Sequence, residues 1–142
     1  MGRSRTILIA DDSRNDVSLV SYSLRSAGYN FPIRWLKDGE MLLRYLRRSE
    51  TARRLPLLVL IDWNMPQSKP FEILKWIRSQ PQYLSLLIVV LTGSSDPTER
   101  KRALDAGANW HIVKSTDLSD VTNLVNRIQN FWLRSPEKSL PA

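Results

Sequence analysis

Three aspartates, a threonine and a lysine directly follow apolar segments of the chain, and their side chains could bind a cation and a phosphoryl group. Asp11 and Asp12 follow the first segment, Asp62 the second, Thr92 ends the third and Lys114 follows the fourth. If these segments are neighbouring parallel strands, their carboxyl ends lie at one edge of a sheet, where such folds bind ligands. The segments are 6–10, 57–61, 86–91 and 110–113.

The residue types predict the chemistry of this edge. Three carboxylates cannot all stay ionised within a few ångströms unless they share a cation, and Mg²⁺ prefers carboxylate and phosphate oxygens. An aspartate can also act as a nucleophile toward phosphorus. Lys114 would neutralise charge on the phosphoryl oxygens and Thr92 would donate a hydrogen bond. Each residue alone is better explained as a helix cap, a turn residue or a solvated lysine, whereas the joint placement favours a functional site.

Length and composition predict one soluble domain. With 142 residues and no cysteine, the chain can bury a core but has neither a disulfide framework nor a thiolate metal site. No apolar segment approaches the roughly 20 residues of a membrane span, and no signal peptide is recognisable. We therefore expect a cytoplasmic protein, with a domain over residues 4–134 and a loose tail over 135–142.

The net charge of +7 comes from arginine-rich clusters around residues 44–48, 53–54 and 100–102. Such a surplus could attract nucleic acid or an acidic partner. No helix-turn-helix, zinc or aromatic nucleic-acid motif accompanies it, so we interpret the clusters as solvated helix faces and expect no nucleic-acid binding.

The order of elements is typical of an α/β fold. Continuous apolar segments at 6–10, 31–36, 57–61, 86–91 and 110–113 indicate strands covered on both faces. Helical periods follow each strand, which gives five βα units and a doubly wound parallel sheet.

Local signals mark the ends of these helices. Gly28 and Gly107 should end the first and fourth helices, and Asp38 should cap the second. Asp96 is predicted to cap the fourth helix, with Glu99 reaching back to the cap.

The set of Asp11-Asp12, Asp62 with Met65-Pro66, Thr92-Gly93, Ala106-Gly107-Ala108 and Lys114 resembles the receiver domain of two-component response regulators. The resemblance implies a flavodoxin-like fold with five strands in the order 2-1-3-4-5 and five helices. By resemblance, Asp62 is the phosphoacceptor, and Asp11, Asp12, Asp62 and the backbone carbonyl of Asn64 bind Mg²⁺. Thr92 and Lys114 contact the bound phosphoryl group.

Residues 113–118 and 128–133 are similar to stand-alone regulators that are paired with bacterial phytochromes. The resemblance thus implies a histidine kinase as partner, with a photoreceptor kinase as the favoured type. Two positions depart from the family pattern. Lys69-Pro70 replaces the usual Asp-Gly, which should change the path of that loop, and His111 replaces the aromatic switch residue.

No output domain is expected after the last helix, so the signal would leave through a surface. We expect this surface to be the face of the fourth helix, fifth strand and fifth helix, with Thr92 and His111 as switch residues. Phe131, Trp132 and Leu133 would form a dimer contact. The protein would be a signalling phosphoacceptor rather than an enzyme acting on a metabolite. The alternatives are a small Mg²⁺-dependent phosphohydrolase and a receiver-like adaptor that binds nucleic acid.

Overall fold

The computed structural model describes residues 6–26, 28–51, 54–65 and 67–114, together with residues 123 and 126. It contains a parallel five-stranded sheet in the order β2-β1-β3-β4-β5, as the resemblance implies. The strands are β1 (Ile7–Ala10), β2 (Ile33–Leu36), β3 (Leu58–Asp62), β4 (Ile88–Thr92) and β5 (Trp110–Val113). The helices are α1 (Arg14–Ser26), α2 (Gly39–Thr51), α3 (Pro70–Arg78) and α4 (Pro97–Asp105), with a short 3-10 helix at Pro81–Tyr83.

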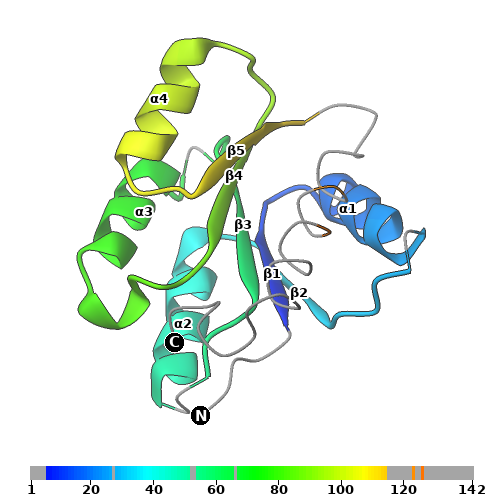
Figure 1. The fold of residues 1–142 in the computed structure, drawn as a ribbon, viewed down its shortest axis with the longest axis horizontal. Helices are drawn as coiled ribbons and strands as arrows, with labels where there is room; N and C mark the ends of the chain where they lie inside the picture. The colour runs from blue at the N-terminus through cyan, green and yellow to red at the C-terminus, as the bar shows by residue number, and fades with distance from the viewer. Residues whose placement is uncertain are drawn as a thin grey trace.

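Helices cover both faces of the sheet, which explains why its central strands are continuous apolar runs (Figure 1). On one face, Val17, Val20 and Leu24 of α1 pack against odd-numbered positions of β1. On the other face, α2, α3 and α4 pack against the alternate side chains of the same strands. Every residue of β1, β3 and β4 is buried, so these packed strands hold the residues at their ends in place.

The predicted helix signals agree with the structure in most places. Gly28 and Gly107 both have left-handed backbone conformations, with φ of 92° and 116°, and each follows a helix end. The Asp38 side chain accepts a hydrogen bond from the Met41 amide at 2.8 Å and caps α2. Strand β2 begins two residues later than predicted, at Ile33. The predicted fifth helix lies outside the described residues apart from residues 123 and 126, which are both helical.

At the amino-terminal edge of the sheet, Arg78 joins two loops, the one between α3 and β4 and the one between α4 and β5. Its Nε donates to the Gly107 carbonyl at 2.8 Å, one terminal nitrogen donates to the Tyr83 carbonyl at 2.8 Å, and the other donates to the Leu86 carbonyl at 2.7 Å. The second terminal nitrogen also donates to the Asn109 side chain at 2.7 Å. The cation is therefore held by neutral oxygens, and burial lowers the pKa of its guanidinium.

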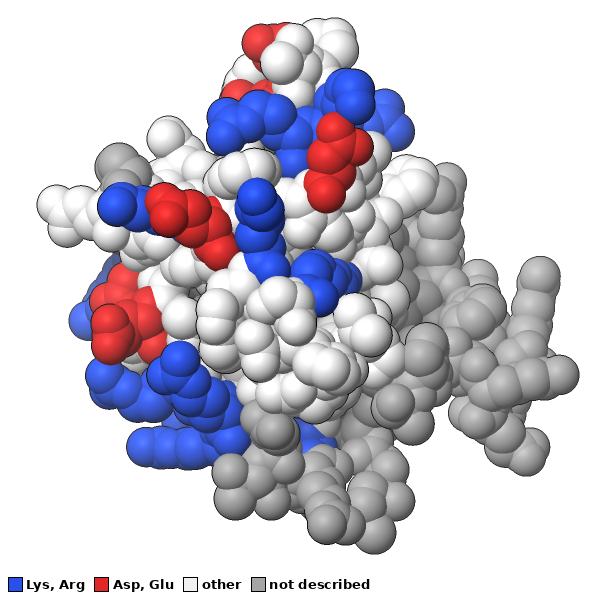
Figure 2. All heavy atoms as spheres, turned by 90° about the vertical axis from the view of Figure 1, so that its left-hand side faces the viewer, with Lys and Arg blue, Asp and Glu red and all other residues white. Residues whose placement is uncertain are grey.

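Basic and acidic side chains alternate over much of the face that carries α2, α3 and α4 (Figure 2). Several arginines lie over aromatic rings: Arg47 over Trp76 at 5.2 Å and Arg102 over Phe71 at 4.6 Å. Lys101 pairs with Asp105 at 2.8 Å. Part of the positive charge thus serves local packing. No helix within the described ranges is long and apolar enough to span a membrane.

Candidate functional site

Four of the predicted site residues lie together at the carboxyl edge of the sheet, where two of the aspartates contact the ammonium group of Lys114. Its Nζ lies 3.1 Å from Asp11 Oδ2 and 3.1 Å from Asp62 Oδ1. Asp11 and Asp62 are 1% and 2% exposed. Asp12 completes the cluster, because one carboxylate oxygen of each aspartate lies within 4.8 Å of the others. The predicted meeting of the three acids and the lysine at one place is confirmed.

Asp16 is a further member of the site that the sequence reasoning missed. Its carboxylate accepts a hydrogen bond from Lys114 Nζ at 2.7 Å, the shortest of the three contacts of this lysine. Asp16 lies in the first turn of α1, one helical turn after Asp12. That spacing, together with an acid at a helix start, was the signal available in the sequence.

The charges of the site are unevenly balanced. Burial, followed by the negative charge of Asp62, raises the pKa of Asp11 to about 6, although the Ser13 amide and Lys114 oppose this shift. Burial alone would lower the pKa of Lys114, but the hydrogen bond to Asp16 and the charges of Asp62 and Asp11 raise it overall. The lysine thus stays charged, and its single positive charge is shared by the carboxylates of Asp11, Asp16 and Asp62.

Backbone contacts orient Asp11. The Trp35 indole donates to the Asp11 carbonyl at 2.6 Å, and the Ser13 amide donates to Asp11 Oδ1 at 2.9 Å. Ser13 Oγ in turn accepts from the Asp16 amide at 3.3 Å. Ser13 is therefore the N-cap of α1, which leaves the Asp12 carboxylate for the acidic cluster.

Thr92 is buried at the end of β4, where its hydroxyl donates to the Glu99 carboxylate and accepts from the Ser94 amide. The prediction that Glu99 reaches back to the Asp96 cap is wrong, because the Asp96 amide donates to Ser94 Oγ at 3.1 Å instead. Asp96 itself caps α4 as predicted, accepting from the Thr98 amide at 2.9 Å.

His111 pairs with Val90 in the sheet and alternates with the buried Ile112. Its side chain therefore faces the α4 side, while Trp110 is 43% exposed. The buried His111 Nε2 has no hydrogen-bond partner within the described part of the chain. Burial lowers the pKa of His111, Glu99 opposes this effect and Arg100 adds to it.

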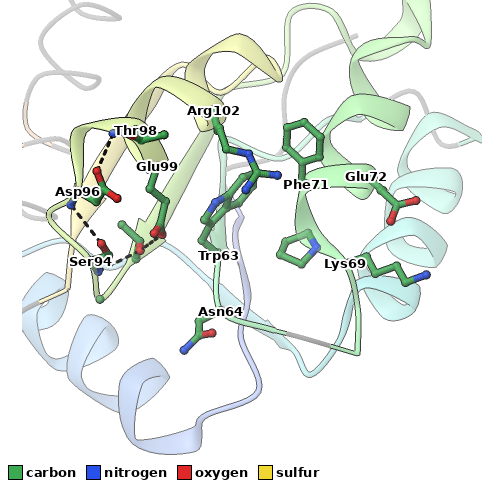
Figure 3. Close-up of a pocket in the computed structure, with 13 residues that line it drawn as sticks. Trp63, Asn64, Lys69, Phe71, Glu72, Ser94, Asp96, Thr98, Glu99 and Arg102 are labelled. Carbon is green, nitrogen blue, oxygen red and sulfur yellow. Dashed lines mark hydrogen bonds between the residues drawn. The ribbon is translucent and has the colours of Figure 1, made fainter.

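The loop between β3 and α3 contains Lys69 and Pro70 in place of the usual Asp-Gly. Lys69 adopts a left-handed conformation with φ of 48°, and Pro70 starts α3. Beside this loop lies a cavity of about 820 Å³ between α3 and α4, which Figure 3 shows with Trp63, Arg102 and Phe71 along one side. Trp63 packs edge-on against Phe71.

Asn64 is exposed after β3, and its amide donates to Asp62 Oδ1 at 3.0 Å. Both contacts of Asp62 within the described residues involve Oδ1, from the Asn64 amide and from Lys114. Oδ2 therefore has no hydrogen-bond partner there. A buried carboxylate with one uncommitted oxygen, beside an acidic cluster and a lysine, is suited to attack an electrophilic phosphorus.

Comparison with known proteins identifies the family. The family model described as "Response regulator receiver domain" matches residues 7–126. This chain belongs to the response regulator receiver family. The receiver domain has its acidic cluster where the sequence predicted it, at the carboxyl edge of β1 and β3.

Individual relatives support the assignment over nearly the whole chain. The receiver domain is 30% identical to "Response regulator Rcp1" of Synechocystis over 97% of this chain and 94% of that protein. It is 31% identical to "Probable methanogenesis regulatory protein FilR2" of Methanothrix harundinacea over 92% of this chain and 86% of that protein. The structure of the phosphorylated cyanobacterial phytochrome response regulator RcpA matches with a TM-score of 0.76 and 28% identity, over 97% of this chain and 99% of the other. Phytochrome response regulators are thus among its relatives, as the second resemblance predicted.

Proposed function

We propose that this protein is a single-domain response regulator that accepts a phosphoryl group on Asp62 from a histidine kinase. The observation that carries this proposal is the placement of Lys114 within 3.1 Å of both Asp11 and Asp62. Such a lysine can neutralise charge on a phosphoryl group bound to the neighbouring carboxylate.

A divalent cation fits the donor set of the site. Asp11, Asp12 and Asp62 offer hard carboxylate oxygens, and the Asn64 carbonyl is the proposed fourth protein ligand. The raised pKa of Asp11 reflects a buried acid for which one lysine is not sufficient compensation. Mg²⁺ would neutralise negative charge on the carboxylates and on the incoming phosphoryl oxygens. A structure titled as the Mn²⁺-bound form of Rcp1 matches this chain with a TM-score of 0.74 and 29% identity, which supports a divalent ion.

The transfer step follows from the contacts of Asp62. Oδ2 attacks the phosphorus of a kinase phosphohistidine, and the new O–P bond forms as the P–N bond breaks. The departing imidazole keeps the electron pair of that bond and takes up a proton. Lys114 holds Oδ1 and lies beside the new phosphate, and Thr92 donates its hydroxyl to a phosphoryl oxygen. The reaction modifies the protein itself and turns over no external metabolite.

The output follows from movement of Thr92 toward the phosphate. The His111 side chain, whose buried Nε2 has no partner among the described residues, is the proposed second switch residue. We propose that it changes position and alters the face of α4, β5 and the last helix. The proposed dimer contact through Phe131, Trp132 and Leu133 lies outside the described residues.

The upstream kinase is proposed to be of the bacteriophytochrome type, because RcpA is named as a phytochrome response regulator and is similar along its whole length. The two alternatives are less well supported. A phosphohydrolase lacks support from the family match. The pairing of arginines with aromatic rings, and of Lys101 with Asp105, favours solvated helix faces over a nucleic-acid surface.

Incubation with a small phosphodonor and Mg²⁺, followed by intact mass spectrometry, tests the proposal. The wild type should gain one acid-stable, base-labile phosphate, and Asp62→Asn should gain none. Phosphate on both proteins, or steady phosphate release from many substrates, would contradict the proposed role of Asp62. Transfer from purified phytochrome-type kinases, compared with other histidine kinases, tests the partner.

A further inference from the structure

The Thr92 hydroxyl already uses its only donor hydrogen in a hydrogen bond to another side chain. A hydroxyl offers one donor and two acceptor lone pairs. The donor is used by Glu99, and one lone pair accepts the Ser94 amide at 3.1 Å. Thr92 is only 2% exposed, so water has little access to replace either contact. A phosphoryl group on Asp62 can accept a hydrogen bond from Thr92 only after the hydrogen bond from Thr92 to Glu99 breaks.

Glu99 is held in this role by the local structure of α4. Pro97 starts the helix, and Asp96 caps it through the Thr98 amide. Because Ser94 satisfies the Asp96 amide, the Glu99 carboxylate is released from the cap. The positive end of the helix favours a negative charge in this first turn. Figure 3 shows the Glu99 side chain extending from α4 to the end of β4, where the hydrogen bond to Thr92 is drawn.

We propose that Glu99 is an anionic latch that holds Thr92 in the unphosphorylated position and so weakens phosphoryl binding. This inference rests on the proposed phosphorylation of Asp62. Glu99 acts through one hydrogen bond: its carboxylate accepts the donor hydrogen of Thr92 that a phosphoryl oxygen would otherwise accept. Glu99 touches no reacting atom, so it is a positioning residue. The protein can bind a phosphoryl group only while the hydrogen bond between Glu99 and Thr92 is broken. The apparent affinity for the phosphoryl group is therefore the intrinsic affinity multiplied by the fraction of molecules in that open state.

The affinity for beryllofluoride, a phosphoryl mimic, measures the latch directly. Binding in the presence of Mg²⁺ can be followed by tryptophan fluorescence, since Trp63 lies in the same cavity as Thr92 and Glu99. Glu99→Gln keeps the size of the side chain but removes its charge. It should bind beryllofluoride about tenfold more tightly, which corresponds to about 1.4 kcal/mol.

Glu72→Gln is the matched control, because Glu72 lines the same cavity, lies in the first turn of α3 and is exposed. It carries the same charge change without a contact to Thr92, and its affinity should stay within twofold of the wild type. Equal tightening by the two variants would show a general charge effect and would overturn the latch.

Two further variants separate the hydrogen bond from folding effects. Glu99→Asp keeps the charge but is one methylene too short to hold Thr92, so it should also tighten binding; wild-type affinity in this variant would overturn the hydrogen-bond mechanism. In a Thr92→Ala background, Glu99→Gln should have less than a twofold effect, because the group on which the latch acts is missing. A full tenfold effect there would contradict the proposal.

The wild type distinguishes failure of this inference from failure of the proposed function. If wild type binds beryllofluoride and Asp62→Asn does not, the phosphoryl site is supported, and only the response of Glu99→Gln decides the latch. If wild type and all variants fail to bind, the proposed function is overturned and the latch falls with it.

Discussion

The two edges of the sheet differ in how well their charged side chains are compensated. At the amino-terminal edge, the Arg78 guanidinium is held by backbone carbonyls of two loops and by one side-chain amide, with its donors satisfied. At the carboxyl edge, buried Asp11 and Asp62 share one ammonium group, and the pKa of Asp11 is raised to about 6. The first edge is organised for stability. The second retains uncompensated negative charge, which a cation can relieve.

The largest effect is expected from Arg78→Met, which removes the donor to the carbonyls of Leu86 and Gly107 and leaves the Tyr83 carbonyl with the Leu86 amide only. Loss of this half-buried hub leaves carbonyl groups unpaired and should lower the free energy of unfolding by about 3 kcal/mol. Urea denaturation measures it. Lys75→Met on the same helix is the control, because Lys75 is exposed and should change stability little. Equal effects of the two substitutions would show that Arg78 is not a structural hub.

Gly107→Ala should also destabilise this edge, by about 2 kcal/mol. An added Cβ would lie 2.3 Å from Arg78 Cγ, and the left-handed φ of 116° is unfavourable for alanine. Gly28→Ala separates the two causes, since Gly28 has a φ of 92° and open space around its Cβ position. Chemical denaturation should show a clearly smaller loss for Gly28→Ala. A loss as large as that of Gly107→Ala would mean that backbone strain alone accounts for both.

At the opposite edge, removing a charge should stabilise the protein. Without Mg²⁺ at neutral pH, Asp11→Asn relieves the buried charge while its side-chain oxygen still accepts from Ser13, and Lys114 keeps Asp16 and Asp62. We expect a gain of about 1 kcal/mol in the free energy of unfolding. The exposed Asp105→Asn serves as control. A destabilised Asp11→Asn protein would show that the ionised carboxylate is well compensated.

A pH series sharpens this prediction. The pKa of Asp11 is about 6 in the folded protein and near 3.9 in the unfolded chain. Between these values the folded state binds more protons, so the Asp11 contribution to stability is lost as pH rises. The stability advantage of Asp11→Asn over wild type should therefore shrink as the pH is lowered from 7 to 5. An advantage that stays constant over this range would contradict the raised pKa.

The sequence was sufficient for the architecture and for the convergence of the site. Five apolar segments defined the strands, and the position of each acid directly after a strand placed Asp11, Asp12 and Asp62 together. The strands and the acids that follow them are local sequence patterns, and the parallel topology brings the carboxyl ends of these strands to one edge of the sheet. Strand limits were less accurate, as at Ile33, because pairing with β1 rather than apolar content decides where β2 begins.

Contacts between distant side chains could not be predicted in the same way. The sequence assigned Glu99 to the Asp96 cap because the capping box is a local pattern. In the structure, the Glu99 carboxylate instead accepts a hydrogen bond from the hydroxyl of Thr92 in β4. Asp16 was not recognised because its role depends on Lys114, which is 98 residues away. The role of Arg78 could not be predicted because its hydrogen-bond acceptors lie in two loops outside its own helix.

The stability of the protein with and without Mg²⁺ tests the contrast between the two edges most directly. A ligand that binds only the folded state raises its stability. Mg²⁺ should raise the melting temperature of the wild type and of Lys75→Met, and Asp11→Asn should lose most of this shift. No shift in the wild type, or an equal shift in Asp11→Asn, would contradict a cation site at the carboxyl edge.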